Sequence, residues 1–277
     1  MNELPFKRFI VNLPQWSVER AAMEATATFA ELLKLQLTAA FVEDAEIHRL
    51  AAMPGLRELR PLGAGWHPVD PAQWHRAFAD AALKAKAAFE AAVRNCSVES
   101  SFLTIRGTIR TLVSEHQSED IVVVMQPKNP AERVSQQYID LVEEAFSTRA
   151  AVMMVPAIMA CSSGPVVAIA RRIADPSVRI ALAVAAAANE GLIVVPTFDG
   201  EQQAALLQSL AGGRRVPVRI DEGAGLIPEM PASSFPAARE HERLVIMTRA
   251  GEGRDLSMAT DIVTRRRVPV LTVPDAD

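Results

Sequence analysis

The run Ile121-Val-Val-Val-Met125 is the stretch of this sequence that most directly indicates its fold. Consecutive apolar residues of this length suit a strand that is buried on both faces, as in parallel sheets covered by helices on each side. A similar run, Leu244-Val-Ile-Met247, occurs in the second part of the chain. Strand-like and helix-like patterns alternate around both runs, which predicts an α/β protein with doubly wound parallel sheets.

The first part of the chain contains five predicted strands in alternation with helices. The other stretches predicted as strands are 9–13, 37–42, 99–106 and 151–155. Apolar residues at a spacing of three to four predict helices over 18–36, 71–92, 108–116 and 129–145. Asp70-Pro71 and Asn129-Pro130 are typical helix starts. The stretch 43–69, which is rich in glycine and proline, predicts a long loop with a helical piece.

The second part of the chain repeats this plan in a shorter form. Its predicted strands are 165–170, 192–195, 216–220, 244–247 and 268–273, and its predicted helices are 175–189, 201–210 and 256–266. Both parts end on a strand closed by Val-Pro, at Val155-Pro156 and at Val273-Pro274. The repeat predicts one α/β domain over 1–157, a linker over 158–164 and a shortened second α/β domain over 165–277.

Composition excludes several classes of protein. Among 277 residues, 49% are hydrophobic and 22% are charged, as in a globular protein with a real core. The net charge of −4 and the aromatic content of 5% argue against nucleic acid and anionic membranes as partners. The start of the chain lacks the apolar core of a signal peptide, and the apolar run Ile180–Ala188 is too short to span a bilayer. Cys96 and Cys161 are expected as free thiols in a reducing compartment, so the sequence predicts a cytoplasmic protein.

These strands and helices resemble those of the universal stress protein family in its tandem two-domain form. The segments that carry the resemblance are 9–13, 39–42, 118–124, 152–156, 166–170, 243–247 and 269–274. The resemblance implies a Rossmann-like fold of the adenine-nucleotide α-hydrolase group, with five-stranded parallel sheets of strand order 3-2-1-4-5. It also implies that the last strands of the two domains, Val152–Val155 and Val270–Val273, pair within one chain, and it leaves a homodimer open.

Many members of that family bind ATP through an acidic residue after the first strand and a G-x2-G-x9-G-[ST] loop after the fourth. The first half of this sequence departs from both features. Asn12 stands near the acidic position, and the loop reads Gln126-Pro-Lys-Asn-Pro130 without any glycine. Because backbone N–H groups cradle phosphate and proline has none, the first half is not expected to bind a triphosphate.

The second half keeps only a remnant of the loop, Arg249-Ala-Gly-Glu-Gly-Arg-Asp255. Val263-Thr264 stands where Gly-Ser or Gly-Thr is expected, and Arg171 and Arg172 lie near the position of the acid. One interpretation is a flexible turn. The other is a small site for an anion or a nucleotide fragment beside a helix start. Its candidate ligand-binding residues are Arg171, Arg249, Gly251 and Gly253.

No other motif indicates catalysis or a metal ion. His67, Asp70 and His75 lie close together, but Asp70 is expected to cap a helix, so no metal site is predicted. The triplet Arg265-Arg-Arg267 is better explained by the negative end of a helix than by a phosphate. No nucleophile elbow, zinc-protease motif or complete P-loop is present, so the chain is not expected to be an enzyme and has no predicted catalytic residue.

The favoured hypothesis is therefore a universal stress-like protein with degenerate nucleotide sites and a binding or regulatory role in a stress response. It predicts no cofactor and an unknown protein partner. One alternative is a sensor that binds ATP or AMP through an atypical loop in the second half. A nucleotide hydrolase of the same fold group and a protein that only contacts other proteins are the remaining alternatives.

Overall fold

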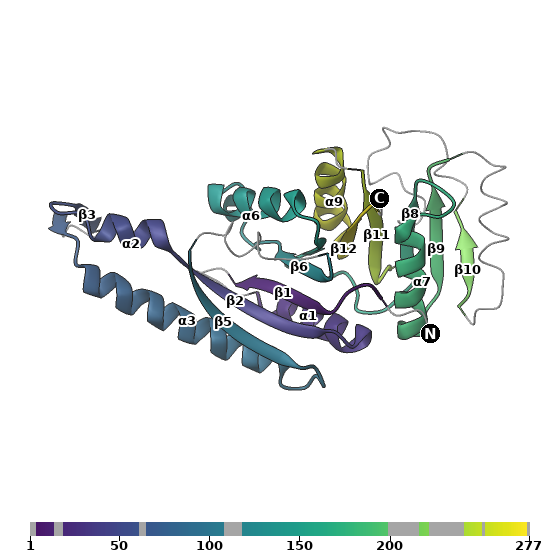
Figure 1. Cartoon of the computed structure of the whole chain (residues 1–277), viewed down its shortest axis with the longest axis horizontal. Coiled ribbons are helices and arrows are strands. Elements are labelled where there is room, and N and C mark those ends of the chain that lie inside the picture. The colour runs from purple at the N-terminus through teal and green to yellow at the C-terminus, as the bar shows by residue number, and fades with distance from the viewer. Residues whose placement is uncertain are drawn as a thin grey trace.

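A single ten-stranded sheet runs through the whole protein (Figure 1). The structure is a computed structural model that describes residues 4–13, 19–60, 65–107, 118–198, 216–221, 241–250 and 253–275. The strands of the large sheet are β1 (Arg8–Leu13), β2 (Gln36–Asp44), β5 (Ser100–Gly107), β6 (Asp120–Met125), β7 (Ala151–Val155), β8 (Val166–Ala170), β9 (Leu192–Pro196), β10 (Val218–Ile220), β11 (Leu244–Arg249) and β12 (Val270–Pro274). The helices are α1 (Arg20–Leu33), α2 (Ala45–Ala51), α3 (Pro71–Val93), α5 (Pro130–Arg133), α6 (Gln136–Ser147), α7 (Pro176–Ala188) and α9 (Gly253–Arg266).

The sheet consists of two parallel halves with the same strand order. The first half runs β5-β2-β1-β6-β7 and the second half runs β10-β9-β8-β11-β12, so each has the expected 3-2-1-4-5 order. The halves meet where β7 and β12 pair in antiparallel fashion, with Met153 opposite Leu271. The expected pairing of the last strands within one chain is thereby confirmed. The domain boundaries at 157 and 165 remain a prediction.

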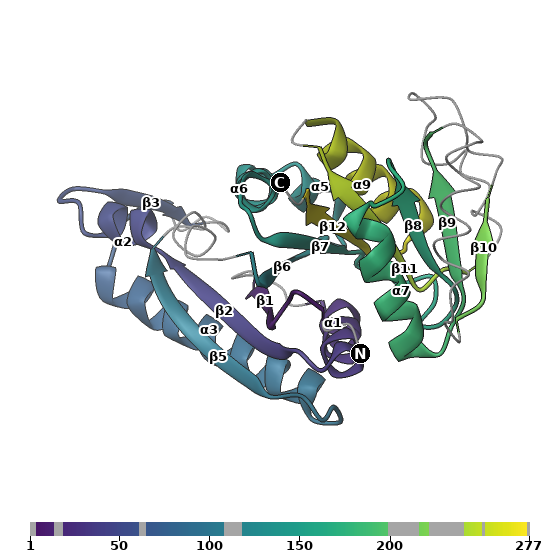
Figure 2. The same ribbon diagram turned by 45° about the vertical axis from the view of Figure 1, so that its right-hand side comes forward.

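Two hydrophobic clusters cover the faces of this sheet. Residues of α1, α3 and α7 pack on one face, and residues of α6 and α9 pack on the other. Each cluster contains residues from both halves, so neither core stops where β7 meets β12. Figures 1 and 2 show α6 and α9 side by side above this meeting point, which we call the junction. All residues of β6 and β7 are buried, in agreement with the continuous apolar runs from which these strands were predicted.

The predicted helix starts are confirmed, but one predicted helix is split. The Asp70 carboxylate accepts a hydrogen bond from the backbone N–H of Ala72 at 2.9 Å, and Pro71 is the first residue of α3. The helix predicted over 129–145 ends after α5, and Ser135 starts α6 by accepting from the N–H of Tyr138 at 3.3 Å. A serine hydroxyl competes with the helix for backbone partners, which explains the break.

The stretch 43–69 is where the structure departs most from expectation. β2 continues to Asp44, α2 follows, and β3 (Arg57–Arg60) pairs with β4 (Gly65–Pro68) in an antiparallel hairpin. The described residues of this segment, 45–60 and 65–68, project from the body together with the first turns of α3, and we call them the arm (Figures 1 and 2). The predicted helical piece is confirmed as α2, but the prediction of a loop for the rest was wrong, because the two strands are short, mostly polar and exposed and lack the apolar run that marks a buried strand.

The structure leaves some expectations open. The helices predicted over 108–116 and 201–210 lie outside the described residues. In the part of the chain that the structure describes, no helix has the length and apolar character needed to cross a bilayer.

Candidate functional site

The carboxyl ends of β8 and β11 form the switch point of the second half. These strands are neighbours, with Ile169 opposite Met247. The helices that follow them lie on opposite faces of the sheet, α7 with α1 and α9 with α6. Open α/β sheets bind ligands where such helices diverge. The candidate residue Arg171 follows β8 directly, and Arg249 is the last residue of β11.

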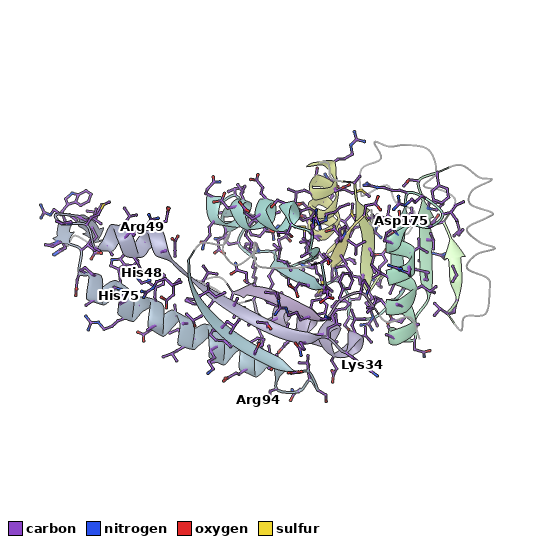
Figure 3. All side chains as sticks on the ribbon, in the orientation of Figure 1. Lys34, His48, Arg49, His75, Arg94 and Asp175 are labelled. Carbon is purple, nitrogen blue, oxygen red and sulfur yellow. The ribbon has the colours of Figure 1, made fainter. Side chains whose placement is uncertain are left out.

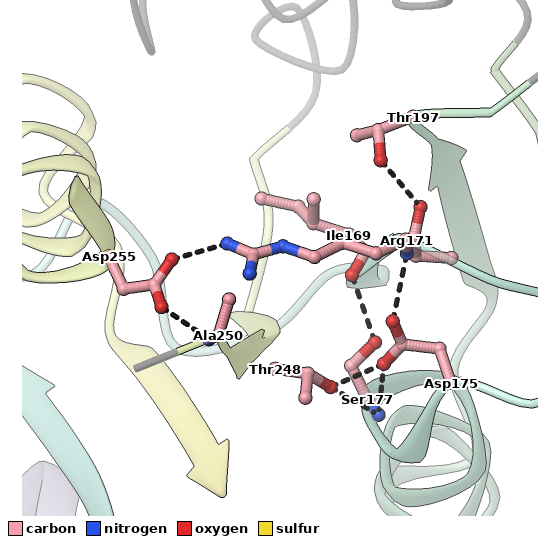
Figure 4. Close-up of polar contacts among 9 residues, drawn as sticks. Ile169, Arg171, Asp175, Ser177, Thr197, Thr248, Ala250 and Asp255 are labelled. Carbon is pink, nitrogen blue, oxygen red and sulfur yellow. Dashed lines mark hydrogen bonds and ion pairs between the residues drawn. The ribbon is translucent and has the colours of Figure 1, made fainter. Parts of the chain in front are cut away.

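Asp255 joins the two sides of this switch point (Figure 4). It lies in the first turn of α9, where the helix dipole favours a negative charge, and is only 2% exposed. One carboxylate oxygen forms an ion pair with the Arg171 guanidinium, and the other accepts the N–H of Ala250 at 2.5 Å. The protein's own carboxylate therefore has the partners that would attract an anion: an arginine, a backbone N–H and a helix N-terminus.

A buried polar network fixes the backbone of Arg171. Its N–H donates to Asp175 at 2.8 Å, and the same carboxylate accepts the N–H of Ser177 at 2.9 Å and the hydroxyl of Thr248. The Ser177 hydroxyl donates to the carbonyl of Ile169 at 2.9 Å. These bonds connect the end of β8, the start of α7 and the end of β11, so the loop that carries Arg171 is anchored from three elements (Figure 4).

Arg249 takes part in the junction rather than in this network. Its guanidinium donates to the carbonyl of Phe146 at 2.8 Å and to the carbonyl of Ala150, and lies 5.8 Å from the ring centroid of Phe146. Burial lowers the pKa of Arg249, and the charge of the nearby Asp255 partly offsets that effect. Asp255 is thus the group near both predicted arginines, but the Arg249 guanidinium already contacts main-chain oxygens of the first half.

The two candidate glycines have different outcomes. Gly253 is the first residue of α9, and a Cβ built on it would meet no atom within 4 Å. Packing therefore does not require glycine at this position. Gly251 lies outside the described residues. A role of either glycine in ligand binding stays a prediction.

In the first half, two side chains of the loop after β6 at the corresponding switch point are engaged, one within that loop and one across the junction. Gln126 donates to the Thr264 hydroxyl at 2.7 Å, across the junction. The Asn129 side chain accepts the N–H of Ala131 at 3.0 Å, which caps α5. Asn12, at the end of β1, is buried, and its side-chain oxygen has no hydrogen-bond partner among the described residues.

The histidine that sequence reasoning associated with His67 and Asp70 instead contacts a residue from α2. His75, near the start of α3, and His48, in the arm, point toward each other (Figure 3), with ring centroids 4.7 Å apart. His48 also lies 3.4 Å from the Glu43 carboxylate. The described residues contain no group of three or more His, Cys, Asp or Glu side chains arranged to hold a metal ion. Sequence spacing gave no signal for the contact between His48 and His75.

The basic triplet at the end of α9 is paired with acidic side chains where its partners are described. Arg265 forms an ion pair with Asp261, and Arg266 forms one with the buried Glu242. Burial lowers the pKa of Arg266. Arg265 and Arg266 stand in the last turn of the helix, which agrees with their interpretation as partners of the helix dipole.

Comparison with known proteins gives a structural likeness only. No protein-family profile matches the sequence, and no curated protein matches it. A universal stress protein from Archaeoglobus fulgidus DSM 4304 is 14% identical and has a TM-score of 0.69, with coverage of 100% of this chain and 99% of the other. A protein described as a universal stress protein from Pseudomonas aeruginosa UCBPP-PA14 is 14% identical, with a TM-score of 0.50 over 97% of this chain and 93% of the other.

The same arrangement also occurs in a different setting. The cytoplasmic domain of a prokaryotic cation chloride cotransporter is 12% identical and has a TM-score of 0.51, covering 96% of this chain and 95% of that domain. At such identities the likeness concerns the fold, and one fold hosts many functions. The strand order and these likenesses together show that the chain has the α/β fold of the universal stress proteins.

Proposed function

We propose that this chain is a cytoplasmic binding protein of the universal stress type, with two copies of the fold in tandem, and that it regulates a stress response without catalysis. The observation that carries the proposal is the position of Asp255. Its carboxylate binds Arg171 and the Ala250 N–H at the start of α9. A phosphate group would need those same partners, so an internal anion already satisfies them.

The first half supports the same conclusion by other means. Pro127 and Pro130 remove two N–H donors from the loop after β6, and the side chain of Asn129 occupies the N–H of Ala131. Gln126 is buried against Thr264. We therefore expect neither half to bind a nucleoside triphosphate.

The test is the response of the purified protein to nucleotide. We expect no ATP or AMP in the supernatant after denaturation and no shift of Tm on adding either. A ligand at about 100 times its Kd stabilises the native state by about 2.7 kcal/mol. For a chain of this size that corresponds to a shift of roughly 5–10 °C. Such a shift, or steady release of phosphate from ATP, would contradict the proposal and favour a sensor or a hydrolase.

A matched pair of variants tests the role of Asp255. Asp255→Asn keeps the shape of the side chain but removes the charge that satisfies Arg171. We expect this variant, unlike the wild type, to gain a shift of Tm with AMP or inorganic phosphate. The double variant Asp255→Asn/Arg171→Ala is expected to lose that gain. If Asp255→Asn folds and shows no anion dependence, Asp255 does not stand in for a phosphate.

A role in contacts with other proteins is favoured by the arm. Apolar surfaces exposed together often mark interaction sites. Large apolar side chains are exposed along this segment, including Leu59 at 62% and Trp66 at 60%; the full set is Leu50, Met53, Leu56, Leu59 and Trp66. Leu59 and Trp66 are directly opposite each other in the hairpin, so they share one face.

The double variant Leu59→Ser/Trp66→Ser tests this second role. We expect it to lose any protein that co-purifies with the wild type. Leu83→Ser, which changes an equally exposed leucine of α3 outside the arm, is expected to retain that protein. Equal retention by the two variants would place the contact elsewhere.

A further inference from the structure

The outer edge of β5 is the most open edge of the ten-stranded sheet. β5 is eight residues long and pairs with β2 over its whole length in a regular register, from Leu37 opposite Ser100 to Asp44 opposite Gly107. No described strand pairs with its other side. The opposite edge of the sheet is β10, which has only three residues and follows a proline. A short strand is one of the ways in which proteins blunt an edge, and β5 lacks it.

The hydrogen bonds to β2 show which backbone groups of β5 face outward. The N–H of Leu37 donates to the carbonyl of Glu99 at 2.9 Å, so the backbone groups of Glu99 point toward β2. Alternate residues of a strand direct these groups to opposite sides. Ser100, Phe102, Thr104 and Arg106 therefore present their N–H and C=O groups to the open side.

The side chains of β5 also lack the devices that prevent strands from pairing. From Ser100 to Ile105 the strand has no charge and no proline, and its continuous register leaves no bulge. Arg106, near the end, lies 3.5 Å from the Glu43 carboxylate of β2. Leu103 is 49% exposed on this strand. An uncharged and regular edge with an exposed leucine is suited to strand addition.

We propose that two copies of this chain associate edge to edge through β5, in antiparallel fashion, about a twofold axis at Leu103. Side chains of the same face of the sheet meet across such an axis only when opposite residues both have odd numbers or both have even numbers. With Leu103 opposite its own copy, Phe102 is opposite Thr104, and Ser100 is opposite Arg106. These are the outward-facing residues, so their N–H and C=O groups meet in hydrogen-bonded pairs.

Self-complementarity makes a second copy the occupant that this edge fits. The two exposed leucines cover each other at the axis, and neither arginine is opposite a like charge. The chain already uses this mode once, since β7 and β12, the end strands of two halves with the same strand order, pair in antiparallel fashion. β5 is the one long end strand of the described sheet that this pairing leaves open. The proposal does not depend on the absence of nucleotide.

Mass in solution is the first test. Sedimentation velocity over a wide range of concentration is expected to give a species of twice the 30.0 kDa chain mass. Thr104→Pro removes an outward N–H and leaves the bonds to β2 intact, so it is expected to give a monomer with nearly unchanged circular dichroism. Leu103→Lys, which puts like charges on the axis, is expected to do the same without a backbone change. A wild-type monomer at the highest concentration, or a dimer that survives both substitutions, overturns the proposal.

Disulfide formation tests the register. Leu103 is expected in a non-hydrogen-bonded pair with its copy, where Cα atoms are about 4.5 Å apart, within the range of a disulfide. In a background with Cys96→Ser and Cys161→Ser, Leu103→Cys is therefore expected to form a covalent dimer on mild oxidation. Ser101→Cys is the control, because the two cysteines would lie roughly 14 Å apart along the strands. Equal crosslinking of the two variants, or none at Leu103→Cys, overturns the assigned register.

Discussion

The junction and the arm differ in where they place apolar side chains: the junction buries them, and the arm exposes them to solvent. At the junction, β7 and β12 are buried from end to end apart from the terminal Pro274, and clusters from both halves pack around them. In the arm, a two-stranded hairpin leaves Leu59 and Trp66 in solvent. Burial of apolar area is the main favourable term in folding, so the junction must supply stability that the arm does not. The contrast teaches that buried apolar area is concentrated at the junction, whereas the arm keeps large apolar side chains on the surface.

Truncation of a buried leucine at the junction should have the largest effect. Leu271 is 2% exposed and is opposite Met153. We expect Leu271→Ala to lower the free energy of unfolding by about 2–5 kcal/mol, through lost burial and a residual cavity. Urea denaturation measures this loss. A loss below about 1 kcal/mol would show that the packing of Leu271 adds little to the stability of the junction.

The only tyrosine of the chain should make the junction sensitive to high pH. Burial in the cluster beneath α6 raises the pKa of Tyr138 to about 12, from an ordinary value near 10. The folded state holds the proton of the Tyr138 hydroxyl more tightly than the unfolded state does. The contribution of this proton to the free energy of unfolding is therefore fully present below pH 10. It is lost as the pH rises through about 12, by roughly 2–3 kcal/mol.

Absorbance of the phenolate reports this group alone, because the chain has one tyrosine. Tyr138→Phe is the matched variant, since it keeps the ring and removes the titrating hydroxyl. Its stability is expected to fall less between pH 10 and 12 than that of the wild type. A titration midpoint near 10 in the folded protein would contradict the burial of this side chain.

Removal of the Arg249 guanidinium should have a smaller effect at the junction. Its bonds to the carbonyls of Phe146 and Ala150 tie β11 to the end of α6. Arg249→Leu leaves those oxygens without this donor, at a cost of about 1–3 kcal/mol. Arg265→Leu, which removes an exposed ion pair in the last turn of α9, is expected to cost much less and serves as the control in thermal unfolding. Equal losses of stability in the two variants would mean that the bonds of Arg249 to the carbonyls add no more stability than an exposed ion pair does.

Changes in the arm should have the smallest effect on stability. Leu59→Ser is expected to change the free energy of unfolding by less than about 0.5 kcal/mol, because the side chain buries little area. Urea denaturation of Leu59→Ser and Leu271→Ala under the same conditions measures the effect on stability in the arm and at the junction. A loss above about 1 kcal/mol would mean that the arm is packed in solution against something that covers it.

Much of this arrangement could be predicted from the sequence. Buried strands such as β6 and β11 are marked by continuous apolar runs, and Asp70-Pro71 marks the start of α3 through local capping chemistry. The hairpin of the arm gave no such signal, since its strands are short and face solvent. Local patterns report burial and capping, and the arm depends on neither.

The candidate site was harder to predict because its contacts join residues that are distant in sequence. Arg171 and Asp255 are 84 positions apart, and Arg249 contacts Ala150 across 99 positions. The sequence indicated the arginines but gave no direction for their side chains. The acid in the remnant of the glycine loop was the available clue, because an acid in a first helical turn is suited to the position of an anion.

The antiparallel pairing of β7 with β12 also has a consequence for synthesis of the chain. β12 lies at the centre of the sheet, yet it is the last of its strands to leave the ribosome, and Thr272 bonds to a carbonyl 120 positions earlier. Translation proceeds at about 5–20 residues per second, so the edge of β7 that pairs with β12 stays unpaired for roughly 6–24 seconds. During that interval a fully apolar strand edge is open to incorrect pairing. Slow translation of the second half, or the absence of chaperones, should therefore lower the yield of folded protein before any change in the finished structure is visible.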